Sequence, residues 1–157
     1  MARHGKVNTK EIEDFMKKLQ DSFGGSQRDA FMNDCAKELA ARLLAKVRKR
    51  TPVGVYPEES GKSGGTLRRN WTIGEIRKVG DYYEVEVINP TEYASYVEYG
   101  HRQTPGRFVP AIGKKLKKSW VEGKFMLTIS AGEVQKLAPK ALEKMLRKKL
   151  MEVFKDD

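Results

Sequence analysis

The sequence is poor in the residues that form covalent crosslinks and most metal sites. Its 157 residues include one cysteine, Cys35, and two histidines, His4 and His101. A single cysteine excludes an internal disulfide, and these three side chains cannot close a tetrahedral zinc site without carboxylates at matching spacings, which we do not find. Cys35 lies among apolar residues at helical spacing, so we expect it to be a small side chain of the core.

The usual signatures of catalysis are also missing. No serine or cysteine near His101 carries a recognisable nucleophile motif, and the chain has no GxGxxG sequence. The string GKSGGT at 61–66 superficially resembles a phosphate-binding loop, but Tyr56 stands where that motif requires its first glycine. We therefore predict no catalytic residue, no metal and no cofactor, and we favour a binding or structural protein.

The sequence contains no long hydrophobic run. Hydrophobic residues make up 39% of the chain and charged residues 33%, a composition typical of one globular core with a strongly polar surface. No apolar stretch approaches the roughly 18 residues that cross a bilayer, and Arg3, His4 and Lys6 precede no apolar block of a secretory signal. We expect a soluble cytoplasmic protein with one domain over 1–157, comprising a helical appendage at 8–25 and a core at 26–157.

Acidic residues are the minority among the charged side chains. The chain has 31 Lys and Arg against 21 Asp and Glu, a net charge of +10. Seven of the cations and one acid, Glu122, lie between His101 and Lys124, so +6 of the excess is local. Such a segment favours contact with DNA phosphates or with the acidic rim of a neighbouring protein, although lysines also occur on merely solvated faces. The candidate contact residues are Lys114, Lys115, Lys117 and Lys118.

Apolar residues at helical spacing predict three main helices. The first begins at a capping box of Asn8 and Glu11 and ends before Gly24-Gly25. The second is long, from Ser26 to about Arg50, where the following Pro52 disfavours continuation. The third occupies the C-terminal segment after Ser130 and Glu133, and Pro139 either begins it or kinks it.

The segment between these helices has the composition of a small sheet. Residues 67–79 and 82–89 flank Gly80-Asp81 and predict a hairpin, with Tyr83, Val85 and Val87 facing the core and a bulge at Gly74. We also expect loops at 51–66 and 101–110, a short helix from Thr91 to Gly100, one or two helical turns in 111–120 and a strand over 125–129 that joins the hairpin. The predicted fold class is α+β, a small antiparallel sheet packed against the long helix and the C-terminal helix.

Four strings occur in order along the chain: RTPVG at 50–54, GTLRRNW at 65–71, VINPTEYASYVEYGHR at 87–102 and GKFMLTIS at 123–130. Together they resemble the gene-product-ten-like neck or tail-component family of long-tailed bacteriophages and prophages, over roughly 36–130. The resemblance implies a non-catalytic virion protein at the head-to-tail junction, assembled as a ring in the host bacterial cytoplasm. Its implied partners are copies of itself, neighbouring connector and tail proteins, and the passing DNA. The segment from Val53 to Gly65 is longer than the short loop typical of that family.

A ring subunit presents two different surfaces that join head to tail. We expect the loops 51–66 and 101–110 and the corner at 99–101 to supply them on opposite sides of the core. Arg68 and Arg69 would reach a neighbour's carboxylate or, more simply, Glu84 or Glu86 across the hairpin. The predicted interface residues are Val53, Tyr56, Leu67, Arg68, Arg69, Tyr99, His101, Arg102, Arg107 and Phe108. The alternative function is that of a basic nucleic-acid-binding module.

Overall fold

The computed structural model describes residues 10–155, without the side chains of residues 10–13, 15 and 16. The predicted cap at Asn8 therefore lies outside the described residues. Two helices precede the sheet: α1 at Lys10–Phe23 and the long α2 at Gly25–Arg50. The break between them falls at the two glycines as predicted: Gly24 separates the helices, and Gly25, the first residue of α2, has a positive φ of 51°, a conformation that glycine adopts without strain.

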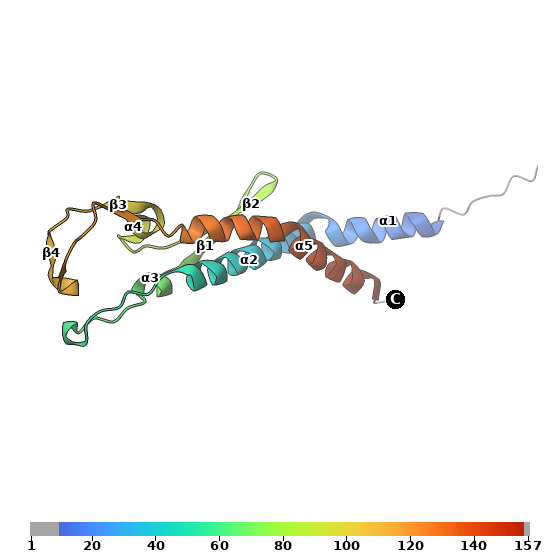
Figure 1. Cartoon of the computed structure of the whole chain (residues 1–157). Helices are drawn as coiled ribbons and strands as arrows, with labels where there is room; N and C mark the ends of the chain where they lie inside the picture. The colour runs from blue at the N-terminus through green and yellow to red at the C-terminus, as the bar shows by residue number, and fades with distance from the viewer. Residues whose placement is uncertain (1–9, 156–157) are drawn as a thin grey trace, which may run out of the picture.

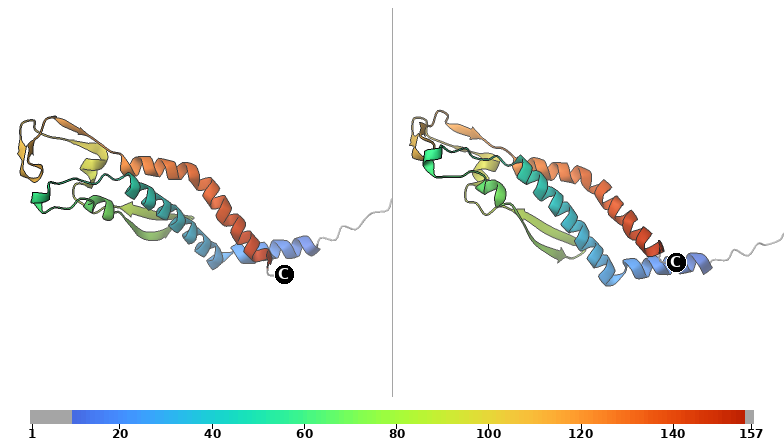
Figure 2. Two further views of the ribbon diagram at one scale, coloured as in Figure 1. Left: turned by 60° about the horizontal axis from the view of Figure 1, so that its bottom comes forward. Right: turned by 90° about the horizontal axis from the view of Figure 1, so that it is seen from below.

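The long α2 and the C-terminal α5, at Met126–Lys155, form the spine of the molecule (Figures 1 and 2). They run antiparallel, and Lys46 and Arg50 of α2 both form ion pairs with Glu133 of α5. Pro139 lies inside α5. Proline removes one helical hydrogen bond and clashes with the preceding turn, which explains the bend after which the second half of α5 runs alongside α2 toward α1 (Figure 2). The kink is thus confirmed as the role of Pro139.

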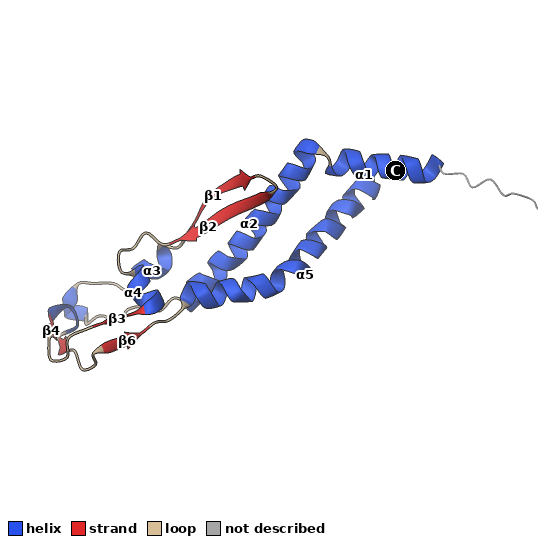
Figure 3. Cartoon of the chain, turned by 90° about the horizontal axis from the view of Figure 1, so that it is seen from above, coloured by secondary structure: helices blue, strands red, loops and turns tan. Residues whose placement is uncertain are grey.

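The predicted hairpin is formed by β1 at Thr72–Val79 and β2 at Tyr82–Ile88. It packs on α2, on the side away from α5 (Figure 3). The register shifts between Ile73 and Ile76, which confirms the bulge around Gly74. The alternation on β2 is also confirmed, because Tyr83, Val85 and Val87 are half-buried. The α+β class is therefore confirmed.

The first strand is shorter than predicted, because residues 66–69 form a helical turn, α3 at Thr66–Arg69. The amide of Asn70 donates to the carbonyl of Thr66, and the side chain of Asn89 donates to the carbonyl of Leu67 at 2.7 Å. These bonds occupy the backbone groups that a strand ladder would use. Trp71 therefore lies before the strand rather than in it, and its side chain is buried.

The expected strand over 125–129 is wrong, because these residues lead into and begin α5. The reason is a tertiary cap. The carboxylate of Glu98 accepts hydrogen bonds from the backbone amides of Leu127 and Thr128, both at 2.9 Å, and from the Thr128 hydroxyl at 2.7 Å. An acid at a helix N-terminus accepts hydrogen bonds from otherwise unpaired amides, and its negative charge interacts favourably with the positive end of the helix dipole. Ser130 and Glu133, after which the helix was expected to begin, consequently lie within it.

Residues 100–122 also differ from the prediction, because they form an extended hairpin that we call the arm. In it β3 at Gly100–Arg102 pairs with β6 at Trp120–Glu122, and β4 at Phe108–Val109 pairs with β5 at Lys114–Lys115. The expected loop at 101–110 is thus partly paired. The expected helical turns at 111–120 reduce to a single 3-10 turn at 110–112.

The buried core lies where the C-terminal end of α2 meets α3 and the start of α5. Its members are almost fully enclosed: Val47, Leu67, Trp71 and Met126. Half-buried residues of β2 and of α4, at Ala94–Tyr99, pack against them. Cys35 lies further along α2 and is 6% exposed, which confirms it as a buried side chain. The core therefore fixes the base from which the loop 51–66 and the arm extend.

Candidate functional site

Two segments extend beyond the core at the same end of the molecule. The loop 51–66 and the arm both lie opposite to the end that holds α1 and the C-terminus (Figures 1 and 2). The expectation that they lie on opposite sides of the core is therefore wrong. Any partner that approaches this end meets both segments together.

The loop 51–66 is anchored at its first residue. Thr51 is fully buried, and its hydroxyl donates to the carbonyl of Val47 at 2.6 Å and accepts from the indole Nε1 of Trp71 at 2.8 Å. The guanidinium of Arg68 donates twice to the carbonyl of Thr51, at 3.0 and 2.7 Å. Thr51, at the start of the loop, is thus held by four hydrogen bonds that involve side chains, two of them from Arg68 of α3 to its backbone carbonyl.

The two predicted arginines bind backbone carbonyls of their own chain. Arg68 contacts Thr51 as described, and Arg69 donates from Nη1 to the carbonyl of Gly64 at 3.2 Å. The simpler expectation, pairing with Glu84 or Glu86, is therefore wrong. The physical reason is that α3 turns both side chains toward the loop instead of along the hairpin.

The two limbs of the loop approach each other closely at glycines. A side chain at Gly64 would place its Cβ 1.9 Å from the carbonyl oxygen of Gly54, so only glycine fits there. Between these limbs and α4 lies a cavity of about 220 Å³, which we call the loop cavity. Its side-chain walls come mainly from Val53, Tyr56, Tyr93 and Val97. The tip of the loop is a 3-10 turn at 58–60 that exposes Glu58 and Glu59.

The arm is rooted at a close backbone crossing. Gly100 has a φ of 83°, and a Cβ there would lie 2.4 Å from the carbonyl oxygen of Val121. A Cβ at Gly123 would lie 2.4 Å from the carbonyl oxygen of Glu98. Glycine at both positions therefore allows the arm to leave the core directly beside the Glu98 cap of α5.

Further out, backbone hydrogen bonds keep the two sides of the arm together. The amide of Gln103 donates to the carbonyl of Ser119 at 2.9 Å. Leu116 exchanges two such bonds at 2.8 Å, accepting from Gly106 and donating to Arg107. The arm is thus a paired hairpin that presents its side chains outward from the core.

The arm carries an unneutralised positive charge. Its six cations are all exposed: Arg102, Arg107, Lys114, Lys115, Lys117 and Lys118. Across residues 10–155, none of the six forms an ion pair. Nearby acids thus do not balance this field, and it is available to phosphate or to carboxylate groups of a partner.

The corner at 99–101 is aromatic and largely accessible. Tyr99 is 63% exposed, and the rings of Tyr96 and His101 lie 5.7 Å apart between centroids. The Nδ1 atom of His101 is buried and has no hydrogen-bond partner. Sequence reasoning chose Tyr99 and His101 but passed over Tyr96 and Trp120, because aromatics at helical or strand spacing are more often part of a core.

The predicted interface residues differ in their exposure to solvent. Leu67 is 5% exposed and belongs to the core, so it is unavailable to a partner in this fold. Tyr56 and His101 are half-buried. The remaining seven are exposed: Val53, Arg68, Arg69, Tyr99, Arg102, Arg107 and Phe108.

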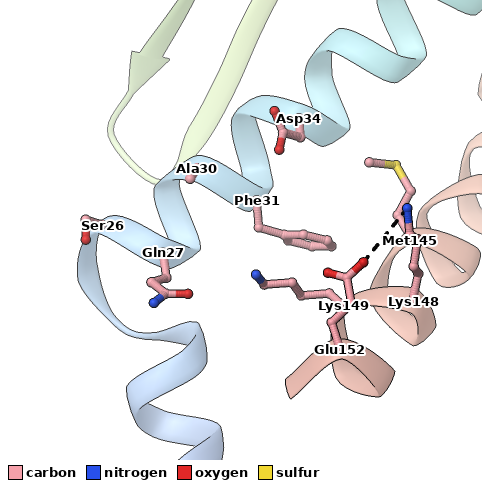
Figure 4. A pocket seen from close by; sticks show the side chains of 9 residues that line it. All are labelled: Ser26, Gln27, Ala30, Phe31, Asp34, Met145, Lys148, Lys149 and Glu152. Carbon is pink, nitrogen blue, oxygen red and sulfur yellow. Dashed lines mark ion pairs between the residues drawn. The ribbon is translucent and has the colours of Figure 1, made fainter. Parts of the chain in front are cut away.

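A second hollow, distant from the arm, was not predicted. It lies between the start of α2 and the second half of α5 and has a volume of about 510 Å³ (Figure 4). Phe31 of α2 projects into it toward Met145 of α5, and Lys148 pairs with Glu152 on its rim. It exists because α5 bends at Pro139. A sequence pattern does not indicate where the second half of α5 lies relative to α2.

Two further observations concern residues 10–155 only. In that part of the chain, no group of three or more His, Cys, Asp and Glu side chains is arranged to hold a metal ion. None of the helices described there has the length and apolarity to cross a membrane.

The fold is α+β, and at the end formed by the loop 51–66 and the arm both aromatic and basic side chains are exposed. The comparisons with known proteins agree. A family model described as "Bacteriophage HK97-gp10, putative tail-component" matches residues 10–100, which are 91 of the 157 residues. The chain belongs to this family of phage tail components, as the four motifs indicated. No curated protein and no solved structure matches it significantly.

Proposed function

We propose that the chain is a non-catalytic subunit of a ring at the head-to-tail junction of a phage, where it completes the neck or tail. Membership of a tail-component family supports a structural role. One observation favours a contact role at this end in particular. The loop 51–66 and the arm extend past the core and leave large side chains such as Phe108 and Tyr99 exposed at 54% and 63%.

The proposed partners follow from this role. They are other copies of the chain in the same ring, together with the connector and tail proteins above and below that ring. The proposal includes no membrane and no small-molecule substrate. The protein would be assembled in the host bacterial cytoplasm and remain in the virion. A head-to-tail ring contact requires two different patches on each subunit, and the arm and the loop 51–66 offer two patches of different chemistry.

The exposed cations of the arm have a role in either of two arrangements. If the arm lines the channel, Lys114, Lys115, Lys117 and Lys118 face the phosphates of passing DNA, and such contacts position the DNA without reading its sequence. If the arm faces an adjacent ring, the same lysines attract the acidic side chains at the rim of that ring and so orient the two rings.

The experiment is a comparison of particles and purified protein. Mass spectrometry of purified particles detects the chain, while light scattering and electron micrographs of the purified protein measure its oligomeric state. We expect the chain in particles and, in the absence of its gene, heads and tails that do not join. A chain that stays monomeric and is absent from particles would contradict the proposal.

A basic nucleic-acid-binding module is the second candidate, and the unpaired cations of the arm favour it. This candidate predicts binding to duplex DNA that weakens steeply as salt rises, because binding releases counterions from the phosphates. Replacing Lys114, Lys115, Lys117 and Lys118 by glutamate would abolish it. The matched control replaces four exposed lysines of α5 by glutamate instead, at a distance from the arm: Lys136, Lys140, Lys144 and Lys155.

A further inference from the structure

The loop cavity has room for one aromatic ring. Its volume is about 220 Å³, whereas a dry apolar cavity of roughly 150 Å³ binds benzene in a well-studied case. Pro52, Val53, Leu67, Tyr93 and Val97 contribute apolar surface to it. A ring seated there would exchange water for these side chains, which is the environment in which interface anchors contribute most.

Phe108 is an exposed ring on a firm support. It lies on β4, where its backbone pairs with Lys115 of β5, and 54% of its surface is exposed. It does not line the loop cavity of its own molecule. Aromatic side chains that lie exposed on a paired hairpin lose little conformational freedom on binding, so they suit the role of an anchor.

Lysines flank the ring, whereas the tip of the loop beside the cavity has an excess of one acid. Lys114 and Lys115 lie across the ladder from Val109 and Phe108. At the cavity, Glu58 and Glu59 are exposed at the tip of the loop, and Glu92 precedes Tyr93. Lys62 is also exposed at the tip and leaves one net negative charge there, while the positively charged Arg68 and Arg69 lie at the ends of the loop, bound to the carbonyls of Thr51 and Gly64.

We propose that Phe108 of one copy inserts into the loop cavity of the next copy, with Lys114 and Lys115 beside the acids of that loop. This inference rests on the proposed ring and names its contact. Each copy supplies one ring and one cavity, so the contact is heterologous and repeats around an axis until it closes. The charged pairs orient the encounter, and the aromatic anchor holds it.

Engineered cysteines test the contact in particles made with the variant gene in place of the natural one. The double variant carries Lys115→Cys and Glu58→Cys, one on each proposed partner surface, and keeps the Phe108 ring in place. Mild oxidation followed by a non-reducing gel should give a ladder of covalent multimers, because each chain is joined to two neighbours. Each single variant should remain a monomer, since the native Cys35 is buried. The control pair, Tyr82→Cys with Glu58→Cys, should give no ladder, because Tyr82 is exposed but lies on β2, outside the proposed contact.

The outcomes separate this inference from the proposed function. Particles that contain the double variant but give no ladder, or only a monomer with an internal bond, would overturn the Phe108 contact and leave the ring role standing. Absence of the natural chain from particles would overturn the ring role and the contact with it.

A second experiment places a charge at the position of the ring. Phe108→Glu should lower incorporation into particles at least tenfold, whereas Tyr82→Glu, at a residue 56% exposed on β2 and outside the proposed contact, should leave it unchanged.

Discussion

Glu98 of α4 and Thr128 of α5 are joined by two hydrogen bonds, from the backbone amide at 2.9 Å and from the hydroxyl at 2.7 Å, both to Oε1 of the carboxylate. Oε2 accepts from the amide of Leu127. Glu98 is 5% exposed. One buried carboxylate thus fixes the start of α5 and, through the neighbouring Gly100, the direction in which the arm leaves the core.

Removing this carboxylate should destabilise the whole chain. Glu98→Ala leaves two amides at the start of α5 without an acceptor, and we expect a loss of about 2–3 kcal/mol in the free energy of unfolding. Glu98→Gln keeps one acceptor oxygen and should cost about half as much. Urea unfolding followed by circular dichroism measures both. Glu92→Gln, at an exposed site on the same segment, is the control, and an equal loss there would refute the capping role.

The hydroxyl of Thr51 should matter more than its methyl group. Thr51→Val keeps the shape but leaves the Nε1–H of the buried Trp71 without its acceptor, so we expect a loss of about 1–3 kcal/mol. Thr51→Ser keeps the hydroxyl and should cost clearly less. Tryptophan fluorescence during urea unfolding reports the change directly. If valine and serine proved equally tolerated, the hydrogen bond would not support the base of the loop.

The ion pairs of Glu133 should make stability depend on pH in the acidic range. The hydrogen bond from Lys46, with the nearby charge of Arg50, lowers the pKa of Glu133 below its ordinary value of 4.5, although partial desolvation opposes the shift. A carboxyl whose pKa is lower in the folded state stabilises the fold above the unfolded pKa, and this contribution disappears as pH falls through the folded pKa.

The measurement is the free energy of unfolding of the natural chain and of Glu133→Gln, at neutral pH and below pH 4.5. The natural chain should be the more stable at neutral pH, and the difference should shrink on acidification. Lys46→Gln removes the largest cause of the shift and should reduce that difference. A difference independent of pH would show that Glu133 acts through packing alone.

The glycine crossing at the base of the arm should not tolerate a side chain. In Gly123→Ala the new Cβ would lie 2.4 Å from the carbonyl oxygen of Glu98, so the backbone must shift. We expect faster amide hydrogen exchange over residues 100–122. Gly132→Ala is the matched control, because its Cβ meets nothing within 4 Å and alanine is the better helix former. Unchanged exchange in the arm of Gly123→Ala would contradict the crossing as its anchor.

Local patterns in the sequence were sufficient for α2 and for the hairpin. The long helix has an apolar stripe and a proline just beyond its end, and the hairpin has its turn residues and alternating strand. The run from Phe125 to Ile129 has the composition of a strand, but the helix is decided by Glu98, which lies about thirty residues earlier in the chain. Such a contact leaves no periodic signal, and propensity yields to tertiary context.

The candidate site was predicted less completely than the fold. Exposed Phe108 and the cations of the arm were found from loop composition and charge density. The pairing of β3 with β6 was not, because strands of three residues separated by seventeen others carry too short a pattern. Leu67 was wrongly predicted to be an interface residue for a related reason. The string GTLRRNW indicates a strand edge, whereas α3 turns Leu67 inward against Trp71 and Met126.

A density map of the intact particle by electron cryo-microscopy, at a resolution that shows side chains, tests the central claim most directly. It should show this chain as a closed ring at the head-to-tail junction, with the arm of each subunit lying against the loop 51–66 of its neighbour. A particle in which the chain is found elsewhere, or in single copies whose arms touch no other subunit, would contradict the account.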